Sequence, residues 1–298
     1  MATLKDIQMK IVAVKKTRQI TKAMNMVATS KLRNAQIKME DFRPYAAKFA
    51  EVLGSLAGKA DAGGNPLLCE RDEVKTTDII VMTSDRGLCG SFNTNLIQQA
   101  KKLAQAQAAD GKSVRVICVG KKGRDFARKT AFPIVAEHIG VVGGGFGFNV
   151  ASNIGTAAIN GFLAEESDEV HVVYAEFISM ARHNAVTKKL LPISAVEPEE
   201  VEEAGSAEGE YLPEHICEPS ADLLLADLLP KNISVQIYSA LLETSASEHA
   251  ARMMAMDNAT TACNDMVDSL TLVYNKARQA AVTSELMDIV GGAEALKG

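Results

Sequence analysis

The sequence contains no tryptophan, and aromatic residues make up only 5% of its 298 positions. No run of eighteen apolar residues occurs, which excludes a membrane-spanning helix by the usual length criterion. The first residues, MATLKDIQMK, lack the apolar core of a signal peptide. With 47% hydrophobic and 23% charged residues, the composition is that of a soluble protein rich in helix. We therefore expect a protein on the cytosolic side of the membrane.

Motifs for metals and for catalysis are also missing. The five cysteines are odd in number and scattered, without CxxC spacing, so neither a disulfide framework nor a zinc site follows. Small buried thiols are the simpler interpretation. The five histidines show neither HxxxH nor HExxH spacing. We expect no catalytic residue, no metal and no cofactor.

Charge is distributed unevenly along the chain. Residues 1–40 hold nine Lys or Arg against Asp6 and Glu40, whereas residues 197–227 hold eleven acids and no Lys or Arg. This asymmetry indicates two surfaces with different partners, although two solvated faces would give the same pattern. The basic residues fall on several helix faces without aromatic partners, so a protein partner is favoured over nucleic acid.

Two long segments have the pattern of coiled-coil helices. Leu4 to Arg43 contains no Gly or Pro, and Pro44 is expected to kink the helix or to begin its next section. Ile233 to Val290 is similarly uninterrupted and is expected to end at Gly291 and Gly292. Each has an apolar stripe at steps of three and four, which predicts one narrow buried face. The stripes are Leu4, Ile7, Ile11, Val14, Arg18, Thr21, Met24, Ala28, Leu32, Ala35, Met39 and Phe42, and Met253, Met256, Thr260, Cys263, Val267, Leu270, Tyr274, Ala277 and Ala281.

The middle of the chain alternates between strand and helix patterns. Runs at 78–84, 114–120, 133–139, 169–179 and 185–194 have strand character, and 93–109 and 149–165 have helix character. This order predicts a Rossmann-like α/β domain with a mostly parallel sheet. The last two strands could pair across Arg182, His183 and Asn184.

The fold class is therefore α/β plus a long antiparallel coiled coil formed by the N- and C-terminal helices. Neither long helix is apolar enough to stand alone, so the simplest arrangement pairs them and inserts the α/β domain between them. The expected divisions are 1–58 for the first helix, 75–195 for the α/β domain, 196–220 for an exposed acidic loop and 221–298 for the last helix. The tip of the last helix should project beyond its partner.

Two glycine-rich stretches lie in the α/β domain. SDRGLCGSFN, at 84–93, follows a strand and precedes a helix, where α/β proteins bind phosphate, but it has neither GxxxxGK[ST] nor GxGxxG. Gly87 and Gly90 are expected to permit a tight turn, and Asp85 and Arg86 to pair or to reach another chain. GGGFGFN, at 143–149, is expected to be a flexible loop leading into a helix.

Two other functional classes remain open from these patterns. An α/β phosphate-binding enzyme with helical oligomerisation arms would bind ATP or phosphate at 84–93. A coiled-coil adaptor for nucleic acid would bind with strong salt dependence. The missing phosphate motif and the polar end of the last helix count against both.

Four stretches closely resemble the gamma subunits of F-type ATP synthases, in the bacterial form. They are KTRQITKAMNMVATSKLRNAQ (16–36), TSDRGLCGSFNTNL (83–96), SASEHAARMMAMDNAT (245–260) and LTLVYNKARQAAVTSELMDIVGGA (270–293). They cover both ends and the middle of the chain in the order found in that family. The acidic stretch 197–218 matches little in detail, and the cysteine-bearing insertion of chloroplast members is absent.

The resemblance implies a non-catalytic rotor shaft. Such a shaft stands inside a ring of alpha and beta subunits and couples proton flow through the membrane c ring to ATP synthesis or hydrolysis. The α/β domain forms a foot against the epsilon subunit and the c ring, which implies peripheral attachment at the cytoplasmic face of the bacterial inner membrane. The resemblance implies no nucleic-acid partner.

The resemblance also assigns residues. Polar groups near the tip of the last helix would exchange hydrogen bonds with successive beta subunits as the shaft turns. Lys22 and Met24 would lie on the facing helix, level with Arg278. At the foot, Glu208 and Tyr211 would face the c ring or epsilon. The residues implied to contact beta or to affect coupling are Lys22, Met24, Arg252, Arg278, Gln279, Thr283 and Glu285.

Overall fold

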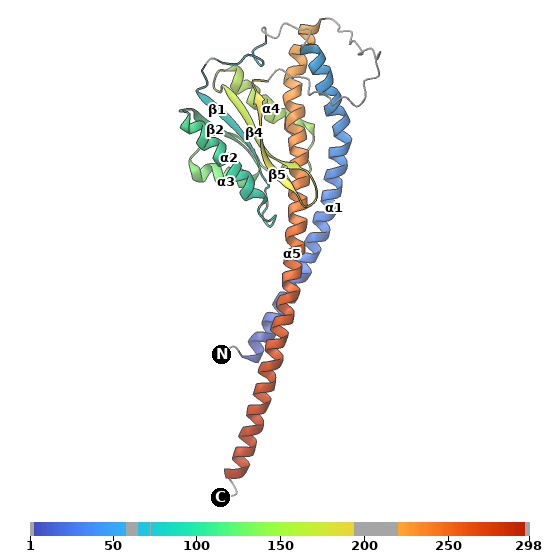
Figure 1. Cartoon of the computed structure of the whole chain (residues 1–298), viewed down its shortest axis with the longest axis vertical. Helices are drawn as coiled ribbons and strands as arrows, with labels where there is room; N and C mark the ends of the chain where they lie inside the picture. The colour runs from blue at the N-terminus through green and yellow to red at the C-terminus, as the bar shows by residue number, and fades with distance from the viewer. Residues whose placement is uncertain (1–2, 58–64, 72, 194–219, 296–298) are drawn as a thin grey trace, which may run out of the picture. The chain divides into compact units, whose positions relative to one another are not determined.

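Two long helices begin and end the computed structural model (Figure 1), which describes residues 3–57, 65–71, 73–193 and 220–295. Helix α1 spans Leu4–Ala57 and α5 spans Ala221–Ala295. At the start of α1, the Asp6 N–H donates to Thr3 Oγ1 and the Thr3 N–H donates to Asp6 Oδ2, a reciprocal cap that satisfies the first turn. The helix α1 continues through Pro44.

The predicted end of the last helix was wrong by a few residues. Helix α5 passes Gly291 and Gly292 and ends at Ala295. Glycine in a helix costs only about 1 kcal/mol relative to alanine, which is too little to stop a helix of 75 residues. The same helix begins before Pro230, as expected from the return of helix near residue 222.

The chain forms two compact units. Unit 1 consists of residues 1–29 and 252–298, and unit 2 consists of residues 30–251. Both long helices contribute to both units, so each unit holds one end of α1 and one end of α5. Each unit has its own buried residues, which we describe separately.

Unit 1 is an antiparallel helix pair. Asn25 Nδ2 donates to the Met253 carbonyl oxygen at 3.0 Å, and Arg18 donates to Asn264 at 3.0 Å. Since the partner number rises along α5 as the residue number falls along α1, the helices run in opposite directions. The predicted stripes face inward: of their members in this unit, every one is buried or half-buried, including Ile7, Met256 and Val267.

Unit 2 contains a five-stranded sheet with the order β3-β2-β1-β4-β5. The strands β1 (Thr76–Met82), β2 (Ser113–Val119), β3 (Ile134–His138) and β4 (Glu169–Phe177) pair in parallel. Strand β5 (His183–Leu191) pairs antiparallel with β4, across a turn closed between Ser179 and Arg182. The expected mostly parallel sheet is confirmed, with strand ends shifted by at most three residues.

Helices cover both faces of this sheet. Helices α2 (Phe92–Ala109) and α3 (Lys121–Thr130) cover one face, where Ile79, Val81 and Cys118 are buried with α2. Helix α4 (Phe148–Leu163) and the unit 2 part of α5 cover the other, where Ile80 and Met82 meet Ile237 and Leu241. Neighbouring strand residues therefore point to opposite cores, as a doubly covered sheet requires. Helix α3 was not predicted.

Candidate functional site

The last turns of α5 carry the largest group of predicted contact residues. Arg278, Gln279, Thr283 and Glu285 are all exposed within two helical turns, and the Thr283 hydroxyl donates to the Gln279 carbonyl at 2.9 Å. The cluster therefore lies on one short stretch of helix, with side chains free to meet a partner.

Apolar side chains share this stretch with the polar ones. Leu286 is 57% exposed and Ile289 68%. Val282, Leu286 and Ile289 follow one another at steps of four and three and mark one helix face, while Met287 and Val290 lie about 100° further round. Large apolar groups exposed on more than one face mark a surface that a partner covers from more than one side.

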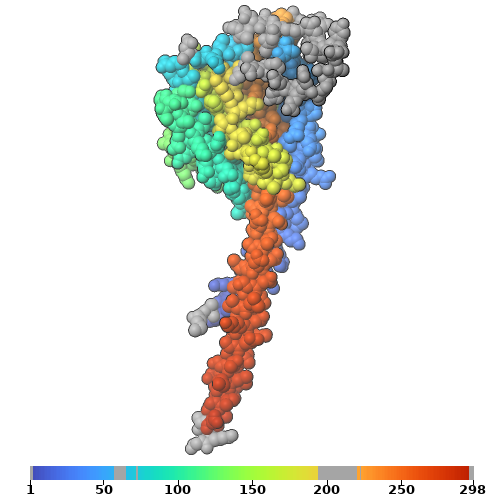
Figure 2. All heavy atoms as spheres, viewed as in Figure 1, coloured from blue at the N-terminus to red at the C-terminus, as the bar shows by residue number. Residues whose placement is uncertain are grey.

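This stretch extends past the beginning of α1. Thr21 faces Thr260, and matching residues one for one along the antiparallel pair places Leu4 opposite roughly residue 277 of α5. Within unit 1, the turns of α5 beyond that point have no residue of the unit 1 part of α1 beside them (Figure 2).

The second predicted group lies elsewhere on the helix pair. The bond from Asn25 to Met253 brings Met24 to the level of Arg252, and the contact between Thr21 and Thr260 fixes Lys22 close by. Arg278 is 26 residues further along α5 than Arg252, about 39 Å of helix. The expectation that Lys22 and Met24 lie level with Arg278 was wrong.

Polar contacts fix the alignment of the helix pair near Lys22 and Arg252. Thr21 Oγ1 and Thr260 Oγ1 are 2.8 Å apart in a part-buried site, and Arg18 reaches Asn264 on the same side. Hydrogen bonds in a seam set register because a slip of one turn would break them. The seam is therefore specified by polar side chains where the apolar stripe is interrupted.

The loop between β1 and α2 is closed by its own side chains. Asn93 Oδ1 accepts from the Ser84 N–H at 3.0 Å, and Asn93 Nδ2 donates to Ser84 Oγ at 2.8 Å. Gly90 has φ 58°, the left-handed conformation that glycine allows, but the other such residue in the turn is Leu88, at φ 64°. A Cβ at Gly87 would meet no atom within 4 Å, so Gly87 is not demanded by close packing.

Asp85 occupies the place where an α/β protein would hold a phosphate. Its Oδ1 accepts from the Lys121 N–H, at the start of α3, at 3.0 Å and from the Gly140 N–H at 3.1 Å. Helix N-termini attract anions because their first N–H groups lack partners in the helix. Here the chain supplies its own carboxylate to α3. The arrangement links three segments of the domain and differs from the expected pairing of Asp85 with Arg86 or another chain.

Charged groups near the first residues of β1 and β2 hold the two strands together. Arg115 makes two hydrogen bonds to Asp78, at 2.7 and 2.9 Å, and Asp78 is only 1% exposed. These bonds raise the pKa of Arg115 above its usual value, although burial acts in the opposite direction. Asp168 accepts the backbone N–H groups of Lys75 and Thr76, which fixes the start of β1.

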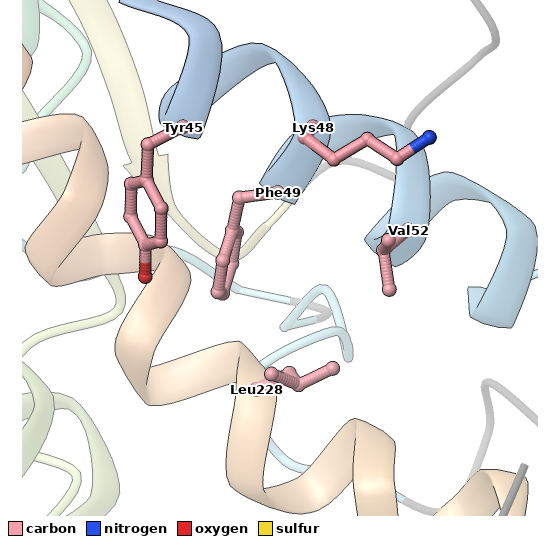
Figure 3. A pocket seen from close by; sticks show the side chains of 5 residues that line it. All are labelled: Tyr45, Lys48, Phe49, Val52 and Leu228. Atoms are coloured by element: carbon pink, nitrogen blue, oxygen red, sulfur yellow. The ribbon is translucent and has the colours of Figure 1, made fainter. Parts of the chain in front are cut away.

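At the end of α1 in unit 2, an apolar hollow of about 200 Å³ opens between α1 and α5. Figure 3 shows Phe49 and Tyr45 on α1 pointing towards the helix that carries Leu228, with the amine of Lys48 turned away. Glu208 and Tyr211, the residues predicted to contact the foot partners, lie outside the described residues, as does most of the acidic stretch 196–220.

Of the cysteines that the structure describes, Cys89 and Cys118 are buried as expected, whereas Cys69 is exposed and Cys263 half-buried. The part of the chain that is described contains no helix apolar enough over a sufficient length to cross a bilayer.

Comparisons with known proteins agree across the whole chain. A family model described as ATP synthase matches residues 3–296. The ATP synthase gamma chain of Desulforapulum autotrophicum is 58% identical over 298 residues, which is 99% of this chain and 100% of that relative. The gamma chain of Lawsonia intracellularis is 48% identical, with both chains fully covered.

Solved structures show the same fold. A chain from the central stalk and c-ring of the Tetrahymena thermophila mitochondrial ATP synthase is 25% identical, with a TM-score of 0.57 over 80% of this chain and 99% of that one. A chain from the Euglena gracilis mitochondrial ATP synthase has a TM-score of 0.67 at 18% identity, over 98% of this chain and 94% of that one. The chain belongs to the gamma subunits of F-type ATP synthases, the non-catalytic central-stalk subunits of that complex.

Proposed function

We propose that this chain is the turning shaft that couples proton flow through a ring of c subunits to ATP synthesis or hydrolysis in a ring of alpha and beta subunits. The observation that carries the proposal is the end of α5, where exposed apolar and polar side chains surround a single helix. A sleeve of subunits would cover such a helix from all sides.

The mixture of side chains suits a surface that must change partners. Purely apolar contacts would favour one fixed docking, whereas Arg278 and Gln279 can form and exchange directional hydrogen bonds with successive beta subunits. Thr283 and Glu285 would add contacts on neighbouring turns. Lys22, Met24 and Arg252 would form a second contact level about 30–40 Å along the pair.

The α/β domain would meet the rest of the rotor. The α/β domain, with Glu208 and Tyr211 of the acidic stretch, would face the epsilon subunit and the c ring. The eleven acids at 197–227 would complement basic loops of those partners. Attachment through them would hold the chain at the cytoplasmic face of the bacterial inner membrane without a span of its own.

Purification of the tagged chain from gently solubilised membranes tests this function. We expect one copy together with several alpha and beta subunits, epsilon and c subunits, and ATP hydrolysis that is lost when Leu270–Gly298 is removed. Removal of only the last three residues, 296–298, is the matched control and should leave hydrolysis intact. A free homo-oligomer that binds ATP by itself would contradict the proposal and favour the phosphate-binding enzyme.

A further inference from the structure

A short segment between β3 and α4, residues 140–147, contacts both long helices within unit 2. We call it the strap. Lys31 on α1 donates from Nζ to the Gly143 carbonyl oxygen at 3.1 Å. From the other side, Glu248 on α5 lies so close that a Cβ on Gly143 would stand 3.4 Å from its Oε1. Gly143 is therefore the point of the strap that meets both helices.

The strap is held firmly to the α/β domain. Val141 and Val142 are buried in the same core as Ile237 and Leu241 of α5, and the Gly144 N–H donates to the Val141 carbonyl, closing a turn. Gly143 adopts φ 84°, a conformation that residues other than glycine rarely adopt. The first residue of the glycine-rich stretch thus follows directly on two buried valines.

Glu248 places a buried carboxylate beside the strap. It is 1% exposed, and its Oε2 lies 2.8 Å from Nδ1 of His249, which is also buried. Burying a carboxylate is unfavourable until its contacts compensate, and an apolar residue of similar size would be easier to bury there. A buried polar group at a helix crossing gives specificity of position, because its contacts are lost if the helix shifts or rotates.

The position of these contacts along the helices is informative. Lys31 lies two residues from the division between the units on α1, and Glu248 lies within one helical turn of the division on α5. The strap thus contacts each helix at the last level that belongs to the α/β unit. Beyond it, both helices continue into the helix pair.

We propose that Lys31, Gly143 and Glu248 form a clamp that fixes both helices to the α/β domain so that torque passes between the domain and the helix pair. This proposal rests on the rotary function proposed above. A helix held only by an apolar face can slide or turn by small steps, whereas the clamp opposes both motions. The three residues are positioning residues and take no part in catalysis.

The test uses the complete membrane complex carrying Lys31→Met, with Lys31→Arg as the conservative variant. Lys38→Met, which removes another exposed lysine two turns along α1, is the matched control. In inverted vesicles, proton pumping and ATP hydrolysis are measured together. We expect the ratio of pumping to hydrolysis to fall at least twofold in Lys31→Met, to recover in Lys31→Arg and to stay at the wild-type value in Lys38→Met.

Hydrogen exchange in the same complexes separates a loosened clamp from a weakened fold. The clamp predicts faster exchange at the amides of 143–147 in Lys31→Met, with β1 and β2 unchanged. An unchanged pumping ratio, or faster exchange throughout the sheet, would overturn the clamp while leaving the rotary function intact. Failure of the wild-type chain to assemble with alpha and beta subunits would instead contradict the rotary function itself.

Discussion

The hydroxyl oxygens of Thr21 and Thr260 lie 2.8 Å apart, on opposite helices of the pair, where the apolar stripe of α1 is interrupted. Each hydroxyl also contacts its own helix, since Thr260 donates to the Met256 carbonyl at 2.7 Å and Thr21 reaches the Arg18 carbonyl at 3.1 Å. The pair can therefore form a chain of hydrogen bonds across the seam without leaving a buried donor unsatisfied.

We predict that replacement of these threonines is not additive. Thr21→Val should lower the free energy of unfolding by about 1 kcal/mol, because the cross-seam bond is lost while a methyl group of similar shape remains. In the Thr21→Val background, Thr260→Val should lower the free energy of unfolding by less than it does in the wild-type chain. Urea unfolding of the full chain in a double-mutant cycle measures the coupling, and strictly additive costs would contradict the bond.

The buried ion pair in the sheet should contribute far more than an exposed one. Arg115→Met leaves the carboxylate of Asp78, 1% exposed, without its cation, and we expect a loss of about 3–5 kcal/mol in the free energy of unfolding. Arg128→Met breaks the exposed pair with Glu137 and should cost less than about 1 kcal/mol. Equal losses in thermal or urea unfolding would show that the burial of Asp78 has no energetic weight.

Stability should fall on mild acidification because half-buried histidines resist protonation. Burial lowers the pKa of His138 and His183, and it lowers that of His171 although Glu169 acts in the opposite direction. As the pH falls below 6.5, the unfolded chain binds protons that the folded chain does not, so the free energy of unfolding decreases. Each histidine contributes at most about 1.4 kcal/mol per pH unit.

The matched variants for this effect are His138→Gln and His183→Gln. Each should flatten the dependence of unfolding free energy on pH between 7 and 5, measured by urea unfolding at several pH values. An unchanged slope in both variants would mean that these histidines titrate alike in the folded and unfolded chain.

Removal of a tip cation should affect coupling more than folding. Arg278 is exposed at the end of α5, so Arg278→Ala should change the melting temperature of the chain by less than about 2 °C. In the assembled complex, we expect fewer protons pumped per ATP hydrolysed. Lys129→Ala, on the exposed surface of α3, controls for loss of a charge. A lowered melting temperature with unchanged pumping would contradict the assignment.

Periodicity along one segment was enough to predict the two long helices and their inward faces. Burial of Ile7, Met256 and Val267 follows directly from steps of three and four, which report local geometry. The strands could be predicted equally well, because β-branched residues fill a sheet that is covered on both faces. Helix α3 was missed since KKGRDFARKT is short, charged and interrupted by Gly123.

Relationships between distant segments could not be predicted in the same way. The position of Lys22 along α5 depends on which residue of α5 meets Thr21. The periodicity of one helix does not determine that register. The role of Asp85 depends on bringing Lys121 and Gly140 to the end of β1. The contact of Lys31 with Gly143 is likewise visible only once α1 and the strap are placed in space.

Direct observation of rotation tests the central claim. Alpha and beta subunits are fixed to a surface in complex with this chain, a light-scattering rod is attached to the α/β domain, and ATP is added. The account predicts continuous rotation in one direction, with ATP hydrolysis in the fixed ring, and loss of that rotation when Leu270–Gly298 is removed. Steady hydrolysis with a stationary rod on the intact chain would contradict it.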